Sequence, residues 1–405
     1  MNIGWIDFSK EDRNKALSVM SLLKEKGAVD EIGIGIVRDA FANEFFPGTS
    51  TIQNGAKYFF IVPYVIKETV NDVINGKIGS DLNKILQIID DKEKECGKLL
   101  LKSKDSEKGV IGKLVLEQGK WLVRPPSSIY WNGIRAYGIF KQAITIPDLI
   151  KIAINLQGKR RMAELGDKGE EMKNRKGDDL NASNDEGIQL FSVPDDYFTN
   201  WRENLTVALT KSEAEFLRKR IKTSACGTLL EYALRNNIDL YKYDTFECLY
   251  EALKNSDLSD EIKEKMKLAC DFNKLVYAIH VRYNYILSNG KNKKAVSKWR
   301  EIIDDIDNIT SVDVCTILKK IIINNYKLKG FLLDFQESLK HRNFEEADKI
   351  IKNREIYLKS FSRAKLCKCD DYNDDTWIGG EYLDYRLPYA ARILKDIYEG
   401  ERDNV

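Results

Sequence analysis

Residues 38–65 read RDAFANEFFPGTSTIQNGAKYFFIVPYV and form the most apolar and aromatic stretch of a chain that is otherwise highly charged. The spacing of the apolar residues predicts the end of an amphipathic helix, a turn at Pro47 and Gly48, and a second buried segment over residues 56–68. A continuous apolar run of this kind fits a helix or a buried strand. We expect this stretch to form part of the hydrophobic core. The function would then be carried by residues on the surface of the protein.

The composition indicates a globular and mostly helical protein. The chain has 405 residues, of which 43% are apolar and 32% charged, and it contains only 7 prolines. Lysine and arginine (65) nearly balance aspartate and glutamate (63). This balance argues against a dedicated basic nucleic-acid binder, although local patches can still attract phosphate.

The sequence lacks the patterns of an export signal and of a membrane span, and we therefore expect a cytoplasmic protein without a membrane partner. The N-terminal residues MNIGWIDFSKEDR lack the pattern of a signal peptide. The longest apolar run, over residues 58–66, is too short to cross a bilayer. Seven scattered cysteines, an odd number, indicate reduced thiols.

We predict a mainly α-helical, two-domain architecture with a small β component in the N-terminal half. The predicted domains are residues 1–157 (α with some β) and 189–405 (helical), joined by a polar linker at 158–188. Short strands are expected at residues 110–111 and 114–116, before a helix that runs from Ser127 to Tyr137. This order is consistent with a winged-helix unit that holds Arg124 and Arg135 near DNA. The alternative is a helix that simply buries its apolar face.

No motif for metal binding, cofactor binding or nucleophilic catalysis is present. Cys367 and Cys369 lack the second cysteine or histidine pair that a zinc site needs, so no metal site is predicted. His280 lies in an apolar helical stretch and His341 among charged residues, and neither has an evident catalytic partner. The sequence has no GxSxG motif and no Walker lysine. We therefore predict no cofactor and no defined catalytic residue.

Two basic segments are the candidate nucleic-acid contacts. The first reads GKNKKAVSKWR over residues 290–300, where a tryptophan sits among cations and could stack on a base. The second reads FLRKRIK over residues 216–222. The candidate contact residues are Lys291, Lys293, Lys294, Lys298, Trp299 and Arg300 in the first segment and Arg218 and Arg220 in the second. The alternative is a solvated helix face, because each segment has acidic neighbours.

Several long blocks resemble a bacterial family of unknown function, DUF6361. They are GWIDFSKEDR, GAVDEIGIGIVRDAFANEFFPGTSTIQNGAKYFFIVPYV, PSSIYWNGIRAYGIF, NREIYLKS and WIGGEYLDYR, which together extend over nearly the whole chain. Members of the family resemble components of bacterial defence islands, found near helicases and phospholipase-D-like nucleases. The resemblance implies a role around foreign DNA by association rather than by site chemistry.

The chain departs from the family pattern at one turn. Where the family reads closer to TRAKYF, this chain has Asn54 and Gly55 in place of the Thr-Arg pair. If that arginine holds a phosphate or a carboxylate in relatives, the interaction is weakened or absent in this chain.

The leading hypothesis is a non-catalytic accessory component of an antiphage defence system. Such a component would bind DNA, a partner protein such as a helicase or nuclease, or both. The alternative is a nuclease-like enzyme centred on Arg38, Asp39 and the turn at residues 47–51, which includes Thr49.

Overall fold

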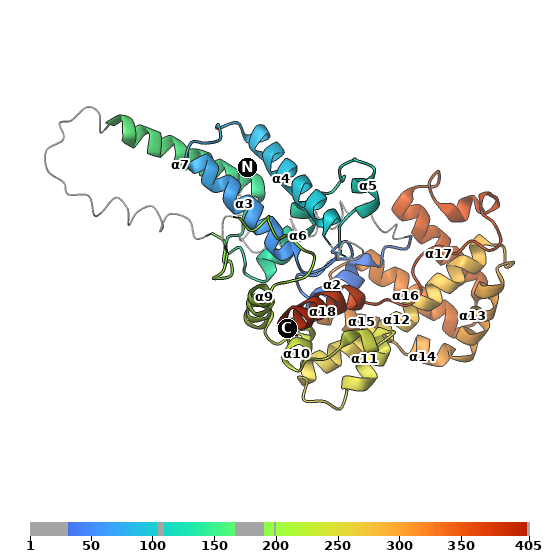
Figure 1. Cartoon of the computed structure of the whole chain (residues 1–405). Helices are drawn as coiled ribbons and strands as arrows, with labels where there is room; N and C mark the ends of the chain where they lie inside the picture. The colour runs from blue at the N-terminus through green and yellow to red at the C-terminus, as the bar shows by residue number, and fades with distance from the viewer. Residues whose placement is uncertain (1–30, 104–108, 167–189, 198–199, 403–405) are drawn as a thin grey trace, which may run out of the picture. The chain divides into compact units, whose positions relative to one another are not determined.

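The computed structural model describes residues 31–103, 109–166, 190–197 and 200–402, and its regular elements are helices (Figure 1). These residues divide into two compact units, each built from two stretches of the chain. The first unit contains residues 31–42 and 243–385, and the second contains the described residues of 43–242 together with 386–402. The prediction of a mainly α-helical protein is confirmed.

The first unit is organised around α12 (Asp260–Leu287), a helix of 28 residues. Five helices pack against it: α11 (Phe246–Leu253), α13 (Lys293–Asp304), α14 (Ile306–Thr310), α15 (Val314–Lys320) and α17 (Phe344–Lys359). The helix α16 (Tyr326–Lys340) packs on α17 after a short turn, so the two form an antiparallel hairpin.

A tail at the end of the first unit is held on α12 by two asparagine side chains. The tail follows η2 (Lys365–Cys367) and η3 (Cys369–Asp371). The side chain of Asn284 donates to Ile378 O at 2.8 Å and accepts from Ile378 N at 2.7 Å. In the same way, the side chain of Asn273 donates to Leu383 O at 3.2 Å and accepts from Leu383 N at 2.8 Å. These amides satisfy backbone groups of the tail at residues 378 and 383.

The second unit has two groups of helices. In one group, α3 (Tyr58–Ile74) packs against α4 (Leu82–Lys102), α6 (Pro126–Ala136) and α7 (Ile146–Gly166). In the other, α18 (Leu387–Arg402) packs on α9 (Lys211–Ser224) and η1 (Leu240–Lys242), and α10 (Leu229–Arg235) packs on α9. The helix α2 (Gly35–Phe45) begins in the first unit and ends in the second.

The apolar run whose type the sequence left open is the helix α3. Twelve of its 17 residues are buried, including Pro63. A helix that is apolar on all sides is stable only when it is surrounded, and α4, α6 and α7 surround α3. Pro63 lies beyond the first turn of the helix and has no N–H to donate to Phe59 O, so the helix loses one backbone bond there.

The predicted small β component is wrong for the residues that the structure describes. Residues 114–116 lie in the short helix α5 (Lys113–Glu117), and the strand expected at 110–111 is absent. Here the N–H of Ile111 donates to Tyr58 Oη at 2.9 Å, and Val110 O accepts from Asn54 Nδ2 at 3.4 Å. Side chains therefore satisfy the backbone groups that a strand partner would take. In the described residues, the β-type pairing is one isolated bridge between Phe140 and Phe191. A winged-helix unit needs a small sheet, so this finding does not support one.

The predicted linker at 158–188 begins as helix. Residues 158–166 continue α7, and residues 167–189 lie outside the described residues. The predicted division of the chain at this linker stays a prediction. Among the described helices, none combines the length and the apolar character needed to span a membrane.

Candidate functional site

The tryptophan predicted to stack on a base is part of the core of the first unit. Trp299 is only 4% exposed, and its ring makes an edge contact with Phe344 at a centroid distance of 5.5 Å. The guanidinium of Arg282 lies 4.8 Å from the ring centroid and is fixed by Asp348 at 2.7 Å. Burial of the ring among these side chains argues against the stacking role predicted for Trp299.

The cations around Trp299 differ in how they are engaged. Lys294 forms an ion pair with Glu381, and Lys298 lies 2.8 Å from Glu301 on the same helix. Lys291 lies 4.0 Å from Asp374. Lys293 and Arg300 are exposed, and neither has an ion-pair partner among the described residues.

The two arginines predicted on α9 bind groups of the second unit. Arg218 forms a two-pronged ion pair with Glu401, with Nη2 2.7 Å from Oε2, and donates to Leu234 O at 2.6 Å. Arg220 donates through Nε to Tyr137 O at 3.1 Å and through Nη2 to Gly138 O. Both side chains thus connect α9 to neighbouring segments of its own unit.

The arginines of the predicted winged helix are partly buried. Arg124 precedes α6 and Arg135 lies in its last turn. Burial lowers the pKa of Arg135. The helix itself is as predicted in outline, with Ile129 and Ile134 buried. This matches the alternative interpretation, a helix that buries its apolar face.

The candidates for an enzymatic centre come from both units. Arg38 and Asp39 belong to the first unit and pair with each other at 3.1 Å, while Thr49 belongs to the second unit. The buried hydroxyl of Thr49 donates to Phe46 O at 2.7 Å and so closes its own turn. Arg386, which the sequence analysis did not single out, donates to Thr49 O at 2.8 Å and supports this turn.

No group of three or more histidine, cysteine, aspartate or glutamate side chains within the described ranges could hold a metal ion. Cys367 and Cys369 are free, partly exposed thiols. His280 is buried on α12 with Gly379 against its ring, and His341 lies 2.8 Å from Glu337 on the surface.

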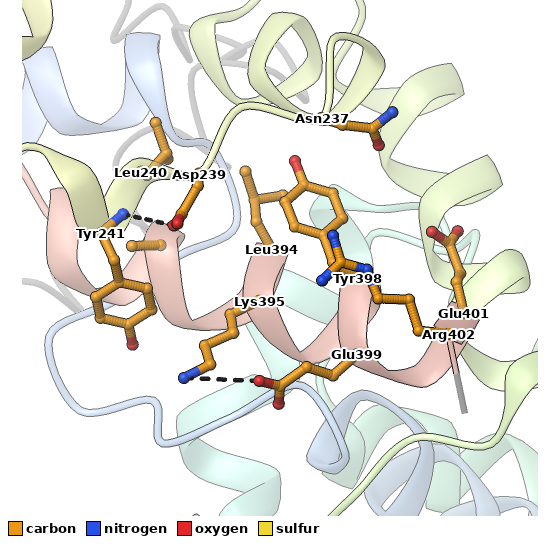
Figure 2. Close-up of a pocket in the computed structure, with 11 residues that line it drawn as sticks. Asn237, Asp239, Leu240, Tyr241, Leu394, Lys395, Tyr398, Glu399, Glu401 and Arg402 are labelled. Atoms are coloured by element: carbon orange, nitrogen blue, oxygen red, sulfur yellow. Dashed lines mark hydrogen bonds and ion pairs between the residues drawn. The ribbon is translucent and has the colours of Figure 1, made fainter. Parts of the chain in front are cut away.

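A pocket of about 450 Å³ lies between η1 and α18 in the second unit (Figure 2). Figure 2 shows Lys395 and Glu399 on one helix, with Tyr241 opposite them. The ammonium of Lys395 is 3.6 Å from Glu399 and 5.5 Å from the centroid of the Tyr241 ring. Tyr398 donates to Ala233 O at 3.0 Å, which fixes its ring in the wall.

Two of the carboxylates at this pocket are already matched by cations of the protein. Glu399 faces Lys395, and Glu401 faces Arg218. Burial raises the pKa of the two pocket tyrosines, Tyr241 and Tyr398, which moves them away from proton transfer near neutral pH, so the arrangement suits the binding of a small polar group better. Sequence reasoning missed the pocket because its residues come from distant segments and form no motif.

A buried carboxyl in the second unit was also missed by sequence reasoning. Glu93 on α4 is 1% exposed and accepts from the hydroxyl of Ser127 at 3.0 Å. Burial raises the pKa of Glu93 to about 8 and that of the Cys96 thiol, one turn away, to about 12. Both groups are therefore mainly protonated at neutral pH, which favours a structural role.

Comparison with known proteins gives one match. Residues 1–147 match the family model DUF6361, a family of unknown function, which confirms the resemblance for that part of the chain. No curated protein and no solved structure matches the chain.

Proposed function

We propose that this chain is a non-catalytic accessory component of a bacterial antiphage defence system, which binds DNA, a partner protein, or both. The resemblance to DUF6361 supplies the context, and the family match itself carries no activity. Partners of the class expected from that context are helicases and nucleases. Of the two kinds of binding, the exposed charges of α13 favour contact with DNA.

A cationic stripe on α13 is the observation that carries the DNA-binding proposal. Lys293, Ser297 and Arg300 are exposed at positions i, i+4 and i+7, which share one side of a helix. The opposite side buries Ala295, Trp299 and Ile302. A helix anchored in this way holds its cations on a rigid element, which suits contact with a phosphate backbone.

The adjoining lysines can reinforce such a contact. Lys294 and Lys298 pair with surface glutamates, and exposed ion pairs of this type contribute only about 0–1 kcal/mol. A phosphate can therefore displace the carboxylate at little cost. The resulting binding would be independent of sequence and sensitive to salt.

The test measures binding of a labelled duplex of about 30 base pairs by fluorescence anisotropy between about 50 and 200 mM salt. The variant Lys293→Glu with Arg300→Glu should bind more weakly, and its salt slope should be smaller by about 0.9 for each phosphate that it no longer neutralises. The matched control reverses Lys84 and Lys98, two exposed lysines of α4, and should bind like the wild type. No binding at the lowest salt concentration, or equally weakened binding in both variants, would contradict the DNA-binding proposal.

The same samples separate the enzymatic alternative from the accessory role. The labelled duplex is incubated with Mg²⁺ and analysed for cleavage. A non-catalytic component leaves it intact. Cleavage that Asp39→Asn abolishes, while fold and duplex binding persist, would instead support the nuclease-like alternative centred on Arg38, Asp39 and the turn at 47–51.

A further inference from the structure

Three aromatic side chains are exposed where α16 begins and α17 ends. Tyr326 is 77% exposed, Tyr357 57% and Phe361 68%. Because the two helices are antiparallel, the first residue of α16 and the last turn of α17 meet at one end of the hairpin. Lys327 bridges them, with its ammonium 4.2 Å from the centroid of the Tyr357 ring. Phe361 follows Tyr357 by four residues.

These rings are not needed to pack the hairpin. Its buried face is made of other side chains, which include Leu328, Phe331, Leu332, Phe335, Ala347 and Ile351. Three large aromatic residues left in water at one end of a helical hairpin are unusual on a monomer surface and mark a binding surface.

The chain segments that carry the rings expose basic side chains. Over residues 319–329 and 352–363, every exposed charged side chain is basic: Lys319, Lys327, Lys329, Lys352 and Arg363. The acid within these ranges, Glu355, is fully buried and accepts from Tyr283 Oη at 2.9 Å and Leu366 N at 3.0 Å. An exposed acid outside these ranges, Asp313, interacts electrostatically with Lys329, but the basic side chains outnumber it, so the surface attracts a polyanion.

We propose that Tyr326, Lys327, Tyr357, Phe361 and Arg363, here called the ring surface, bind single-stranded nucleic acid. Unpaired bases stack on the exposed rings, while Lys327 and Arg363 contact the phosphates. Duplex DNA keeps its bases stacked inside the helix and gains little from exposed rings. The ring surface is separate from the cationic stripe of α13, and its role does not rest on that proposed contact.

An apolar protein partner is the competing occupant of this surface. Ile322 and Leu358 are also exposed nearby and would suit such a partner. The absence of any exposed acid over residues 319–329 and 352–363 favours the nucleic acid. A leucine substitution separates the two occupants, because leucine preserves apolar area but removes the π-face that stacking needs.

The experiment measures binding of the full chain to labelled oligo-dT and oligo-rU of about 20 nucleotides by fluorescence anisotropy at about 50 mM salt. Tyr326→Ala and Phe361→Ala should each weaken binding about tenfold, within the range found when a base loses its stacking partner. Phe361→Trp should bind like the wild type, and Phe361→Leu should bind as weakly as the alanine variant. Tyr382→Ala, which removes a half-exposed tyrosine outside the ring surface, is the control and should have no effect.

Three results would overturn the inference. They are no binding of either oligonucleotide at low salt, wild-type affinity in both alanine variants, and full affinity in Phe361→Leu, which would indicate an apolar occupant. Circular dichroism shows whether each variant is folded, and the exposure of the rings predicts that all are. The two proposed contacts can be told apart. If the reversal of Lys293 and Arg300 weakens only duplex binding, the α13 contact is supported and the ring surface is judged by its own variants. If the ring variants weaken only single-strand binding, the ring surface is supported whether or not α13 binds DNA. The comparison of dT with rU assigns DNA or RNA.

Discussion

The ammonium group of Lys57 lies 2.6 Å from a carboxylate oxygen of Glu213 inside the second unit, where each side chain is 7% exposed. Lys57 precedes the first residue of α3, and Glu213 belongs to the first turn of α9, so the pair joins two helices that are far apart in sequence. Glu213 also accepts from Thr210 N at 2.9 Å within a capping box. One carboxylate therefore satisfies both a buried cation and the open end of a helix.

Removal of the cation from this pair should destabilise the protein strongly. Lys57→Met leaves the Glu213 carboxylate buried without its partner, so we expect a decrease of about 3–5 kcal/mol in unfolding free energy. Urea denaturation followed by circular dichroism measures it. Lys254→Met, which breaks the exposed pair with Glu251, is the control and should cost less than about 1 kcal/mol. Equal decreases in the two variants would show that burial of the Lys57 pair has no energetic consequence.

Glu93 should make the protein less stable as the pH rises. Burial raises the pKa of this carboxyl from 4.5 to about 8 in the folded state. Its contribution to stability is thus complete below pH 4.5 and is lost as the pH rises through about 8, because the unfolded state releases its proton first. Between these limits the unfolding free energy should fall by about 1.4 kcal/mol per pH unit on account of this group.

The test compares wild type with Glu93→Gln in urea melts from about pH 5 to 8, the interval over which this carboxyl ionises in the unfolded state only. The variant keeps the shape of the side chain but cannot ionise, so its stability should depend less on pH. Glu95→Gln, an exposed change on the same helix, should keep the wild-type pH dependence. Parallel pH profiles for wild type and Glu93→Gln would mean that Glu93 is ionised in the folded state.

Trp299 should contribute to stability and not to nucleic-acid binding. Trp299→Ala removes a buried ring that contacts Phe344 and Arg282, with an expected cost of about 3–5 kcal/mol. Trp299→Phe should cost less because it keeps an aromatic ring, and the exposed change Arg300→Ala should lie within about 0.5 kcal/mol of wild type. Unfolding in urea measures all three. A stable Trp299→Ala variant with weaker DNA binding would restore the stacking role.

Much of the fold follows from local sequence rules. Thr210 forms a complete capping box with Glu213 at the start of α9, and such caps can be predicted because they depend on residues three positions apart. The strand predicted over the short apolar run at 114–116 is wrong. A run of three residues has no usable period, and the side chains of Tyr58 and Asn54, more than 50 residues away, bind the backbone just before it.

The roles of the charged residues could not be predicted in the same way. Arg218 lies in a basic segment, yet its partner Glu401 is 183 residues away, and no local pattern indicates that pair. The ring surface is a different case, because the apolar character of its own residues predicts that they are buried, whereas they are exposed. Its tyrosines and phenylalanine lie where apolar periodicity predicts helices, and only the packing of α16 on α17 decides that they remain in water.

Gly55 should be required by its backbone conformation. Its φ of +106° is one that residues with a side chain rarely adopt, and an added Cβ would lie 3.1 Å from Asp396 Oδ2, the acceptor for Ala56 N at 2.7 Å. We expect Gly55→Arg to cost about 1–3 kcal/mol. Gly158→Ala on α7, where nothing lies within 4 Å of the added atom, should instead stabilise by up to about 1 kcal/mol. Thermal melts of both variants measure the contrast, and a Gly55→Arg variant as stable as wild type would show that this turn adopts the same backbone with an arginine.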